Sequence, residues 1–261
     1  FARCCQICQP FMPRKARTES LADAHAAPGG VAAVDRALTL LAAFRQGDLS
    51  LSLAELATRT RLYKSTTLRL LASLEHAGLM QHLDDGRYAL GAELARLNGV
   101  YAASFSLDRV VLPVLRRLVE QTGESAAYHV QQGQGADAVR LCLYRVDSPH
   151  PVRDHIRAGD VLPADRGTGA RVLIAFDPER SRAAVRDRKL YAAIREHGYY
   201  AAEGDRLAGV AGISAPVFHA DGRIAAALTL TMPTHRYDER HVKPVLDGAR
   251  ALNGLVATTP P

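Results

Sequence analysis

Apolar residues recur every three or four positions from residue 31 to residue 42, which is the period of a helix with one buried face. This face is expected to hold Val34, Leu38, Leu41 and Ala42, and Gly47 is expected to mark the end of the run. Residues 12–30, by contrast, are rich in Ala, Gly, Pro and charge and show no sustained period. We therefore expect residues 1–30 to form a flexible arm.

A second and a third helix are predicted before residue 78. Ser52, with Glu55 three positions later, matches a capping box, in which each side chain binds an unpaired amide of the first helical turn. The third helix carries Leu68, Leu71 and Leu74 on one stripe, which we expect in the core. The glycine at position 78 suits the left-handed stop of that helix.

A hairpin is expected directly after the third helix. Two short β-prone runs flank Asp85-Gly86, a dipeptide that supplies positive φ at both central positions of a tight turn. Three helices and a hairpin in about sixty residues are the order of a winged helix-turn-helix. Residues 31–90 are therefore predicted to form a domain of this kind, whose third helix would enter the major groove of DNA.

The rest of the chain predicts a linker and a second domain. Residues 91–122 are helical in period, and their apolar stripe is too long to face water alone, so we expect a linker helix that also takes part in dimerisation. Strand-like runs follow at 125–132, 138–146 and 151–158, and Asp221-Gly222 predicts a second hairpin. With helices between these runs, residues 123–257 form the second domain, and the fold class is α+β with two domains.

Composition excludes several classes of protein. With 48% apolar and 23% charged residues the chain is typical of globular proteins, and no apolar run reaches the roughly 18 residues of a membrane helix. Cys4, Cys5, Cys8 and Cys142 do not make a disulfide framework for 261 residues, which favours the cytoplasm. We expect no metal and no cofactor, and we expect Met12 to be the natural start, with residues 1–11 an extension of it.

The basic residues favour DNA through their clustering and not through their number. The net charge of +6 divides evenly, with eleven basic against eight acidic residues up to position 90 and twenty-two against nineteen after it. Between positions 59 and 69, however, four basic residues occur with no acid among them. Such a run alone is typical of a solvated helix face, but the capped helix before it and the hairpin after it favour a recognition helix.

We therefore predict double-stranded DNA as a partner, bound at a near-palindromic operator by a homodimer or a dimer of dimers. The residues expected to contact DNA are Arg61, Lys64, Ser65, Thr66, Thr67 and Arg69 of the third helix and its approach, with Arg87 in the wing.

The run LSLAELATRTRLYKSTTLRLLASLEHAGLMQHLDDGRYALG at 51–91 resembles the winged helix of IclR-type transcriptional regulators. The similarity continues in the second domain through DSPHPVR, ARVLIAF, HGYY and ISAPVFHADGRIAAALTLTMP, and covers about residues 31–255. The resemblance implies a bacterial transcription factor, a repressor or an activator, whose GAF-like C-terminal domain binds a small molecule. Thr229 and Thr231 keep two hydroxyls of the family pattern, whereas Ala202 and Gly212 replace a carboxylate and a cysteine of a relative that binds small keto acids.

An anionic effector, a carboxylate, is expected at the start of the helix near residue 168, because exposed amides and the helix dipole both favour an anion there. The residues expected to bind it are Arg166, Gly167, Thr168, Gly169, Ser214, Thr229 and Thr231. The alternative, equally weighted, is that the glycines only tighten a loop and that Arg166 pairs with Asp165 or Asp160.

Two other functions compete with the regulator. In the first, the second domain is an enzyme acting on a small acid, but Cys142 alternates with leucines in a strand and has no signature of a base or an oxyanion hole. In the second, the winged helix binds only protein and never DNA. The histidines lack metal-ligand spacing, so no catalytic residue is assigned and the chain is not expected to be an enzyme.

Overall fold

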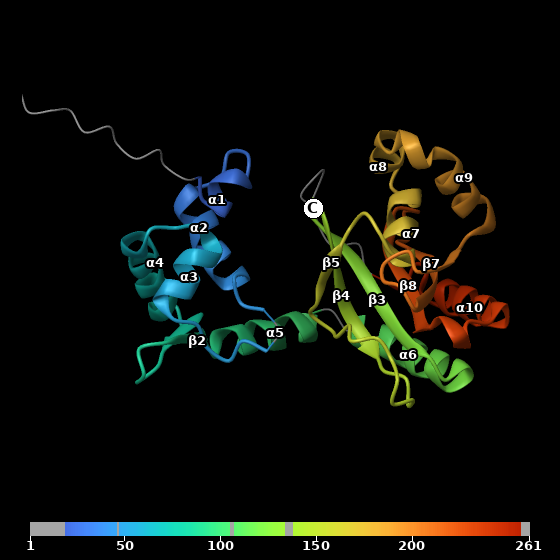
Figure 1. Ribbon diagram of the computed structural model, residues 1–261, viewed down its shortest axis with the longest axis horizontal. Coiled ribbons are helices and arrows are strands. Elements are labelled where there is room, and N and C mark those ends of the chain that lie inside the picture. The colour runs from blue at the N-terminus through green and yellow to red at the C-terminus, as the bar shows by residue number, and fades with distance from the viewer. Residues whose placement is uncertain (1–18, 46, 105–106, 134–137, 257–261) are drawn as a thin grey trace, which may run out of the picture. The chain divides into compact units, whose positions relative to one another are not determined.

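The computed structural model describes residues 19–45, 47–104, 107–133 and 138–256, and the chain divides into two compact units, residues 1–97 and 98–261 (Figure 1). Cys4, Cys5, Cys8 and Met12 lie outside the described residues. Each unit has its own apolar core. None of the helices in the described ranges is both long and apolar enough to cross a membrane.

The first unit has the predicted order of three helices and a hairpin. Its elements are α1 Leu21–Ala24, α2 Ala32–Ala42, α3 Leu53–Thr60, α4 Lys64–His76, β1 Met80–His82, β2 Tyr88–Leu90 and the start of α5 Glu93–Ser104. The additional helix α1 lies in the segment that we expected to be a flexible arm. Ser20 caps it by accepting from the amide of Asp23 at 3.2 Å, and Arg36 of α2 binds the Asp23 carboxylate at 2.6 Å.

Local hydrogen bonds explain where α3 begins. The Ser52 hydroxyl accepts from the Glu55 amide at 3.2 Å, and the Glu55 carboxylate accepts from the Ser52 amide at 2.8 Å. The predicted capping box is thus confirmed. Leu51, next to the cap, bridges to Tyr88 of β2, which attaches the hairpin to the start of α3.

The core of the first unit confirms part of the predicted stripe and corrects the rest. Leu71 and Leu74 are buried, but Leu68 is 50% exposed because the buried face of α4 runs through Thr67, four residues before Leu71. On α2 the residue that is fully buried is Leu40, while Val34 and Leu38 are more than half exposed. That helix has apolar residues on more than one face, so periodicity alone selected the wrong one.

The hairpin is confirmed, with a different turn from the one predicted. Leu83 pairs with Arg87, the Gly86 amide donates to the Leu83 carbonyl at 2.9 Å, and only Gly86 has a positive φ, of 80°. This is a three-residue loop ending in a left-handed glycine. The Asp85 carboxylate accepts from the Arg87 amide at 3.0 Å, and the loop between His219 and Arg223 repeats the same bonds.

The second unit is built on one antiparallel sheet, in the order β5-β4-β3-β8-β7-β6. Its strands are β3 Ser125–Gln132, β4 Val139–Val146, β5 Val161–Pro163, β6 Tyr200–Glu203, β7 Val210–Phe218 and β8 Ile224–Pro233. The helices are α6 Leu107–Thr122, α7 Thr168–Phe176, α8 Pro178–Ala183, η2 Val185–Asp187, α9 Arg188–His197, η3 Thr234–Arg236, η4 Glu239–His241 and α10 Val242–Leu252.

One predicted strand, at 151–158, is wrong. The backbone there is irregular, and the segment is held by side chains and not by a ladder of hydrogen bonds. Ile156 packs in a small apolar cluster with Cys142 of β4, and the Asp154 carboxylate pairs with Arg145 and Arg206.

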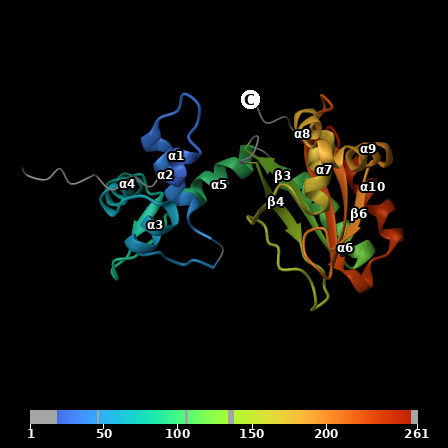
Figure 2. The ribbon, with the colours of Figure 1, turned by 45° about the horizontal axis from the view of Figure 1, so that its top comes forward.

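The two faces of the sheet are covered differently (Figure 2). Helices α6 and α10 pack on one face, where Leu115 and Val245 meet Tyr128, Leu228 and other alternate residues of the central strands. Helix α7 lies against β7 and β8 on the other face, with α8 and α9 beside it. Since side chains alternate along a strand, the residues between those of the main core point toward α7.

Candidate functional site

The first candidate site is the N-terminal end of α4. Arg61, Lys64, Ser65 and Arg69 are exposed there, and Thr66 is half-buried. The first turn holds no acidic residue, and no side chain caps it. Its first amides therefore lack a side-chain acceptor, which suits a phosphate group.

Thr67, Arg59 and Arg87 differ from the other polar residues of this region. Thr67 is fully buried, and its hydroxyl donates to the carbonyl of Tyr63 at 3.1 Å, so it supports the helix. Arg59 pairs with Asp48 and donates to the Ala43 carbonyl at 3.0 Å. Arg87 reaches back from the wing to the Ser50 carbonyl at 2.8 Å, which fixes the hairpin on the helical part of the unit.

An exposed aromatic side chain was missed in the sequence. Tyr63, the residue before α4, is 62% exposed and stands beside Lys64. Its position in the turn directly before the basic residues of α4 was the available signal.

The second candidate site is a cavity between the sheet and the N-terminus of α7. Its lining comes from β3, β4, β6, β7, β8, α7 and three loops, and comprises His129, Arg140, Ile156, Gly167, Thr168, Ala202, Asp205, Arg206, Val210, Ala211, Gly212, Thr229 and Thr231. The cavity has a volume of about 20 Å³, which is room for about one water molecule.

A chain of hydrogen bonds runs along the wall of this cavity. The Ser214 hydroxyl lies 2.8 Å from Thr168 Oγ1 and 2.9 Å from Thr229 Oγ1, and Thr229 Oγ1 lies 3.2 Å from His129 Nδ1. All four side chains are buried. Burial, with the nearby cations of Arg140 and others, holds the pKa of His129 well below its usual value, so the imidazole is neutral at pH 7.

Arg140 is a buried cation without a partner among the described residues. Its side chain comes from β4, the residue is only 2% exposed, and Nε and Nη2 have no hydrogen-bond partner there. Burial, and then the Arg206 charge, lower the pKa of Arg140 to about 10, which still leaves it charged at pH 7. A buried charge of this kind is costly unless an anion joins it.

The nearby carboxylates are bound to other groups. Asp154 pairs with Arg145 and, at 3.3 Å, with Arg206. Asp205 accepts from the Gly167 amide at 2.8 Å and pairs with Arg171 at 3.4 Å. His129 Nε2 and Thr231 Oγ1 are likewise buried with no partner in the described ranges. Unsatisfied polar atoms thus gather at one small cavity.

The predicted effector residues lie partly at this cavity. Gly167, Thr168, Thr229 and Thr231 line it. Ser214 stands behind the wall in the hydrogen-bonded chain, and a β-carbon on Gly169 would lie 2.6 Å from Arg140 Nη1. Arg166 instead has a 58% exposed side chain, 3.7 Å from Asp165, which is the pairing that we set against an effector role.

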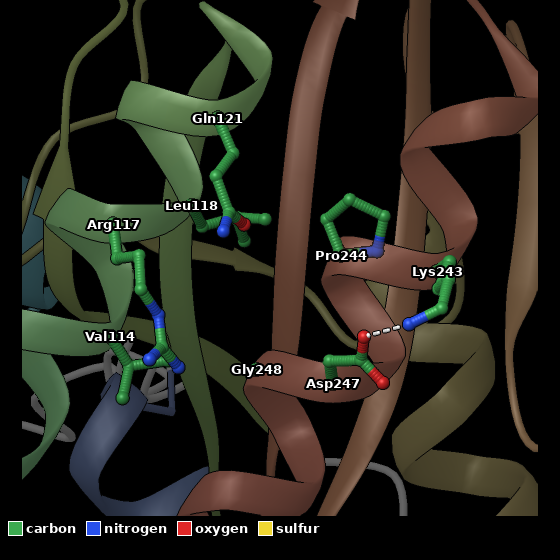
Figure 3. A pocket seen from close by; sticks show the side chains of 8 residues that line it. All are labelled: Val114, Arg117, Leu118, Gln121, Lys243, Pro244, Asp247 and Gly248. Atoms are coloured by element: carbon green, nitrogen blue, oxygen red, sulfur yellow. Dashed lines mark hydrogen bonds and ion pairs between the residues drawn. The ribbon is translucent and has the colours of Figure 1, made fainter.

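Larger hollows lie elsewhere on the second unit. Figure 3 shows one of about 510 Å³ between α6 and α10, where Lys243 binds Asp247 at 2.6 Å and Arg117 points toward the gap. Another, of about 480 Å³, is lined mainly by apolar side chains of β3, β4 and β8. Within the described part of the chain, neither contains a buried polar atom that lacks a partner. The small cavity is therefore the stronger candidate.

The sequence and the fold agree with known proteins. Residues 33–84 match the IclR helix-turn-helix domain, and residues 100–253 match the bacterial transcriptional regulator IclR C-terminal domain. The chain is 29% identical to the glycerol operon regulatory protein of Streptomyces coelicolor over 204 residues, which are 72% of this chain and 79% of that protein. It is 25% identical to the transcriptional repressor IclR of Escherichia coli over 252 residues, 89% of this chain and 91% of that one.

A solved structure supports the same fold. An IclR homologue of Microbacterium hydrocarbonoxydans, complexed with 4-hydroxybenzoate, superposes on this chain with a TM-score of 0.72 at 23% sequence identity. The match covers 85% of this chain and 97% of the homologue's chain. With a helix-turn-helix model and an IclR C-terminal model matched in this order, the chain belongs to the IclR family of bacterial transcriptional regulators, which join a DNA-binding domain to an effector-binding domain.

Proposed function

We propose that this regulator binds a small carboxylate as its effector, with Arg140 as the anchor. The observation that carries the proposal is the buried, charged Arg140 guanidinium with two unpartnered nitrogens beside the start of α7. A carboxylate accepts two parallel bonds from a guanidinium and would compensate the buried charge. Thr231 Oγ1 and His129 Nε2 supply further polar contacts on the same side of the sheet.

The DNA-binding surface of the proposal is the exposed start of α4. Arg61, Lys64, Ser65, Thr66 and Arg69 would contact phosphates and base edges, whereas Thr67 is assigned to the packing of the helix. Arg87 is proposed to hold the wing in place and to present it to the DNA backbone. Such a protein acts where the chromosome lies, which is the cytoplasm of a bacterium.

We also propose that two copies bind one near-palindromic operator. Val31, Val34 and Leu38 follow one exposed face of α2 at spacings of three and four, and Leu97 and Val100 of α5 are exposed as well. A second copy that covers these side chains would remove them from water and present two α4 helices to half-sites about 34 Å apart or a multiple of it. A homodimer, or a dimer of such dimers, follows from this arrangement.

Enzymatic activity is not part of the proposal. Burial raises the pKa of the Cys142 thiol to about 12, so this side chain stays protonated and is a poor nucleophile. No group of His, Cys, Asp and Glu in the described ranges could hold a metal ion. The polar groups at the cavity are suited to binding an anion, and the effector would shift operator affinity by about 5- to 150-fold.

DNA binding is tested by fluorescence anisotropy on labelled DNA from upstream of the chain's own gene, over a salt series. Lys64→Ala with Arg69→Ala is expected to abolish specific binding and to lower the salt slope of the remaining non-specific binding by about 2. Lys243→Ala with Arg250→Ala removes the same charge from exposed positions of α10 and is the matched control. An equal loss of DNA affinity in both double variants, or a wild-type protein that binds no DNA at low salt, would contradict the proposal.

Effector binding is tested with a panel of carboxylic acids, by calorimetry and by thermal unfolding. Arg140→Gln is expected to remove binding of every acid that the wild-type protein binds. Arg166→Gln is the control, because the side chain of Arg166 is exposed and does not line the cavity. If the Arg166 variant loses binding and the Arg140 variant keeps it, the anchor is assigned wrongly.

A further inference from the structure

Asp205 is a carboxylate of the protein itself at the place where an effector carboxylate is expected. Its Oδ2 accepts from the Gly167 amide at 2.8 Å, directly before the first residue of α7. A β-carbon built on Gly167 would lie 3.1 Å from Arg140 Nη2, so the unpartnered guanidinium nitrogen and the Asp205 carboxylate flank the same glycine. Asp205 nevertheless pairs with Arg171 and not with Arg140.

The cavity has to enlarge before a carboxylic acid can enter it. Room for about one water molecule is less than the smallest acids need. The strands and α7 are fixed by buried cores on both faces of the sheet. The loop between β6 and β7, residues 204–209, belongs to none of the apolar clusters of the described chain. It is the wall that can move at the lowest cost.

Backbone bonds hold the two ends of this short loop, where the Gly204 amide donates to the Val210 carbonyl at 2.9 Å and the Gly209 carbonyl accepts from the Thr234 amide at 3.0 Å, and polar side chains hold its middle. Gly204 and Gly209 at its ends have φ of 70° and 79°, and neither would meet a neighbour within 4 Å if it carried a β-carbon. Between them, Asp205 binds the Gly167 amide and Arg206 binds Asp154 at 3.3 Å. Burial lowers the pKa of Arg171, but hydrogen bonds to Tyr191 and Asp205 raise it by more. The Arg171 guanidinium therefore stays charged and holds Asp205.

We propose that Asp205 sets the affinity and the selectivity of the effector site by acting as an internal anion that the effector carboxylate displaces. This inference rests on the proposed carboxylate site. An acid bound to Arg140 Nη2 lies next to the Asp205 carboxylate, and two like charges repel strongly in a buried site. The Asp205 side chain then leaves the Gly167 amide and the 204–209 loop moves outward.

The direct test is Asp205→Asn, which keeps the shape of the side chain and an oxygen for the Gly167 amide but removes the charge. Binding of acetate and benzoate is measured by calorimetry on the full-length protein. We expect the affinity for both anions to rise about tenfold or more, because the charged competitor has gone. Affinity for the neutral isosteres acetamide and benzamide should change less than twofold.

Asp187→Asn is the matched control. Asp187 also pairs with Arg171, at 3.1 Å, but it does not line the cavity and does not touch Gly167. This variant is expected to leave both affinities unchanged. If Asp205→Asn weakens binding, or if Asp187→Asn strengthens it equally, the internal anion is not Asp205. If no carboxylate binds even the wild-type protein, the proposed effector site fails and this inference fails with it.

Hydrogen exchange of the wild-type protein gives a second test that needs no variant. With saturating benzoate, the amides of 204–209 are expected to exchange faster, because the loop has lost its contact with Gly167. Slower exchange of that loop, with Arg140-dependent binding intact, would overturn the displacement of Asp205 and leave the carboxylate site standing.

Discussion

The Arg140 guanidinium lies so close to the backbone of Gly169 that a β-carbon there would be 2.6 Å from Nη1. The same carbon would also lie 3.0 Å from Thr229 Oγ1. At 2.6 Å the guanidinium has to move, and at 3.0 Å the Thr229 hydroxyl has to shift by a few tenths of an ångström, so any side chain at position 169 displaces the Arg140 guanidinium. Glycine at this point of α7 is what gives the buried cation its place.

Gly169→Ala is therefore expected to weaken anion binding at least tenfold while changing stability much less, since alanine is the better helix former. Titration with benzoate measures the first effect and thermal unfolding the second. Gly99→Ala, at a helical glycine with nothing within 4 Å of the added carbon, should leave benzoate affinity unchanged and raise stability by about 0.5 to 1 kcal/mol. Unaltered benzoate affinity in Gly169→Ala would show that Arg140 does not anchor the ligand.

Arg87→Ala is expected to destabilise the first unit. Arg87 Nε and Nη2 bind the hydroxyl and the carbonyl of Ser50, each at 2.8 Å, and these bonds are worth roughly 0.5 to 1.5 kcal/mol. Arg69→Ala removes an exposed arginine and should leave stability unchanged while DNA affinity falls. Denaturant unfolding and anisotropy together separate the two. Loss of DNA affinity without loss of stability in Arg87→Ala would mean that this arginine contacts DNA only.

The two leucines of α4 should behave differently. Leu71 is 1% exposed, so Leu71→Ala is expected to cost about 2 to 5 kcal/mol. Leu68 is 50% exposed, and Leu68→Ala should change the free energy of unfolding by no more than about 0.5 kcal/mol. Chemical denaturation of the two variants measures both changes in the free energy of unfolding. Similar losses of stability in the two variants would show that α4 packs through a different face.

His129 makes the stability of the second unit depend on pH. Burial lowers its pKa in the folded protein, so below about pH 6.5 the unfolded chain binds a proton that the folded chain does not. Stability should fall with decreasing pH from about 6.5 to 5, with a limiting slope of about 1.4 kcal/mol per pH unit. His129→Gln should remove the contribution of His129 to this slope, while the contribution of His241, whose pKa burial also lowers, remains. His235→Gln, at an exposed position, should leave the slope unchanged.

The first unit could be predicted in detail because its signals are local. Ser52 and Glu55 sit three residues apart, and Asp85-Gly86 turns the chain on its own. What could not be read locally was which face of a helix meets the core. Leu68 and Leu38 were assigned to it from period alone, whereas burial depends on the neighbouring helices.

The anion site also could not be predicted from local sequence, because its residues come from distant parts of the chain. Arg166 was chosen because it precedes the helix, yet the buried cation at the cavity is Arg140, which comes from a strand and lies 26 positions before Arg166 in the sequence. A signal for it existed. Cys142 alternates with leucines in a predicted strand, and Arg140 lies two residues before it, on the same face. Only the packing of α7 against the sheet shows that this face closes into a cavity.

The main core and the cavity occupy opposite faces of the same strands. Along β8, Leu228 and Leu230 pack under α6 and α10, while Thr229 and Thr231 face the cavity. Substitutions at the second set can change which acid is recognised without repacking the first. The domain is thus suited to engineering as a biosensor, in which the ligand is exchanged by altering cavity residues on a sheet whose main core lies on its other side.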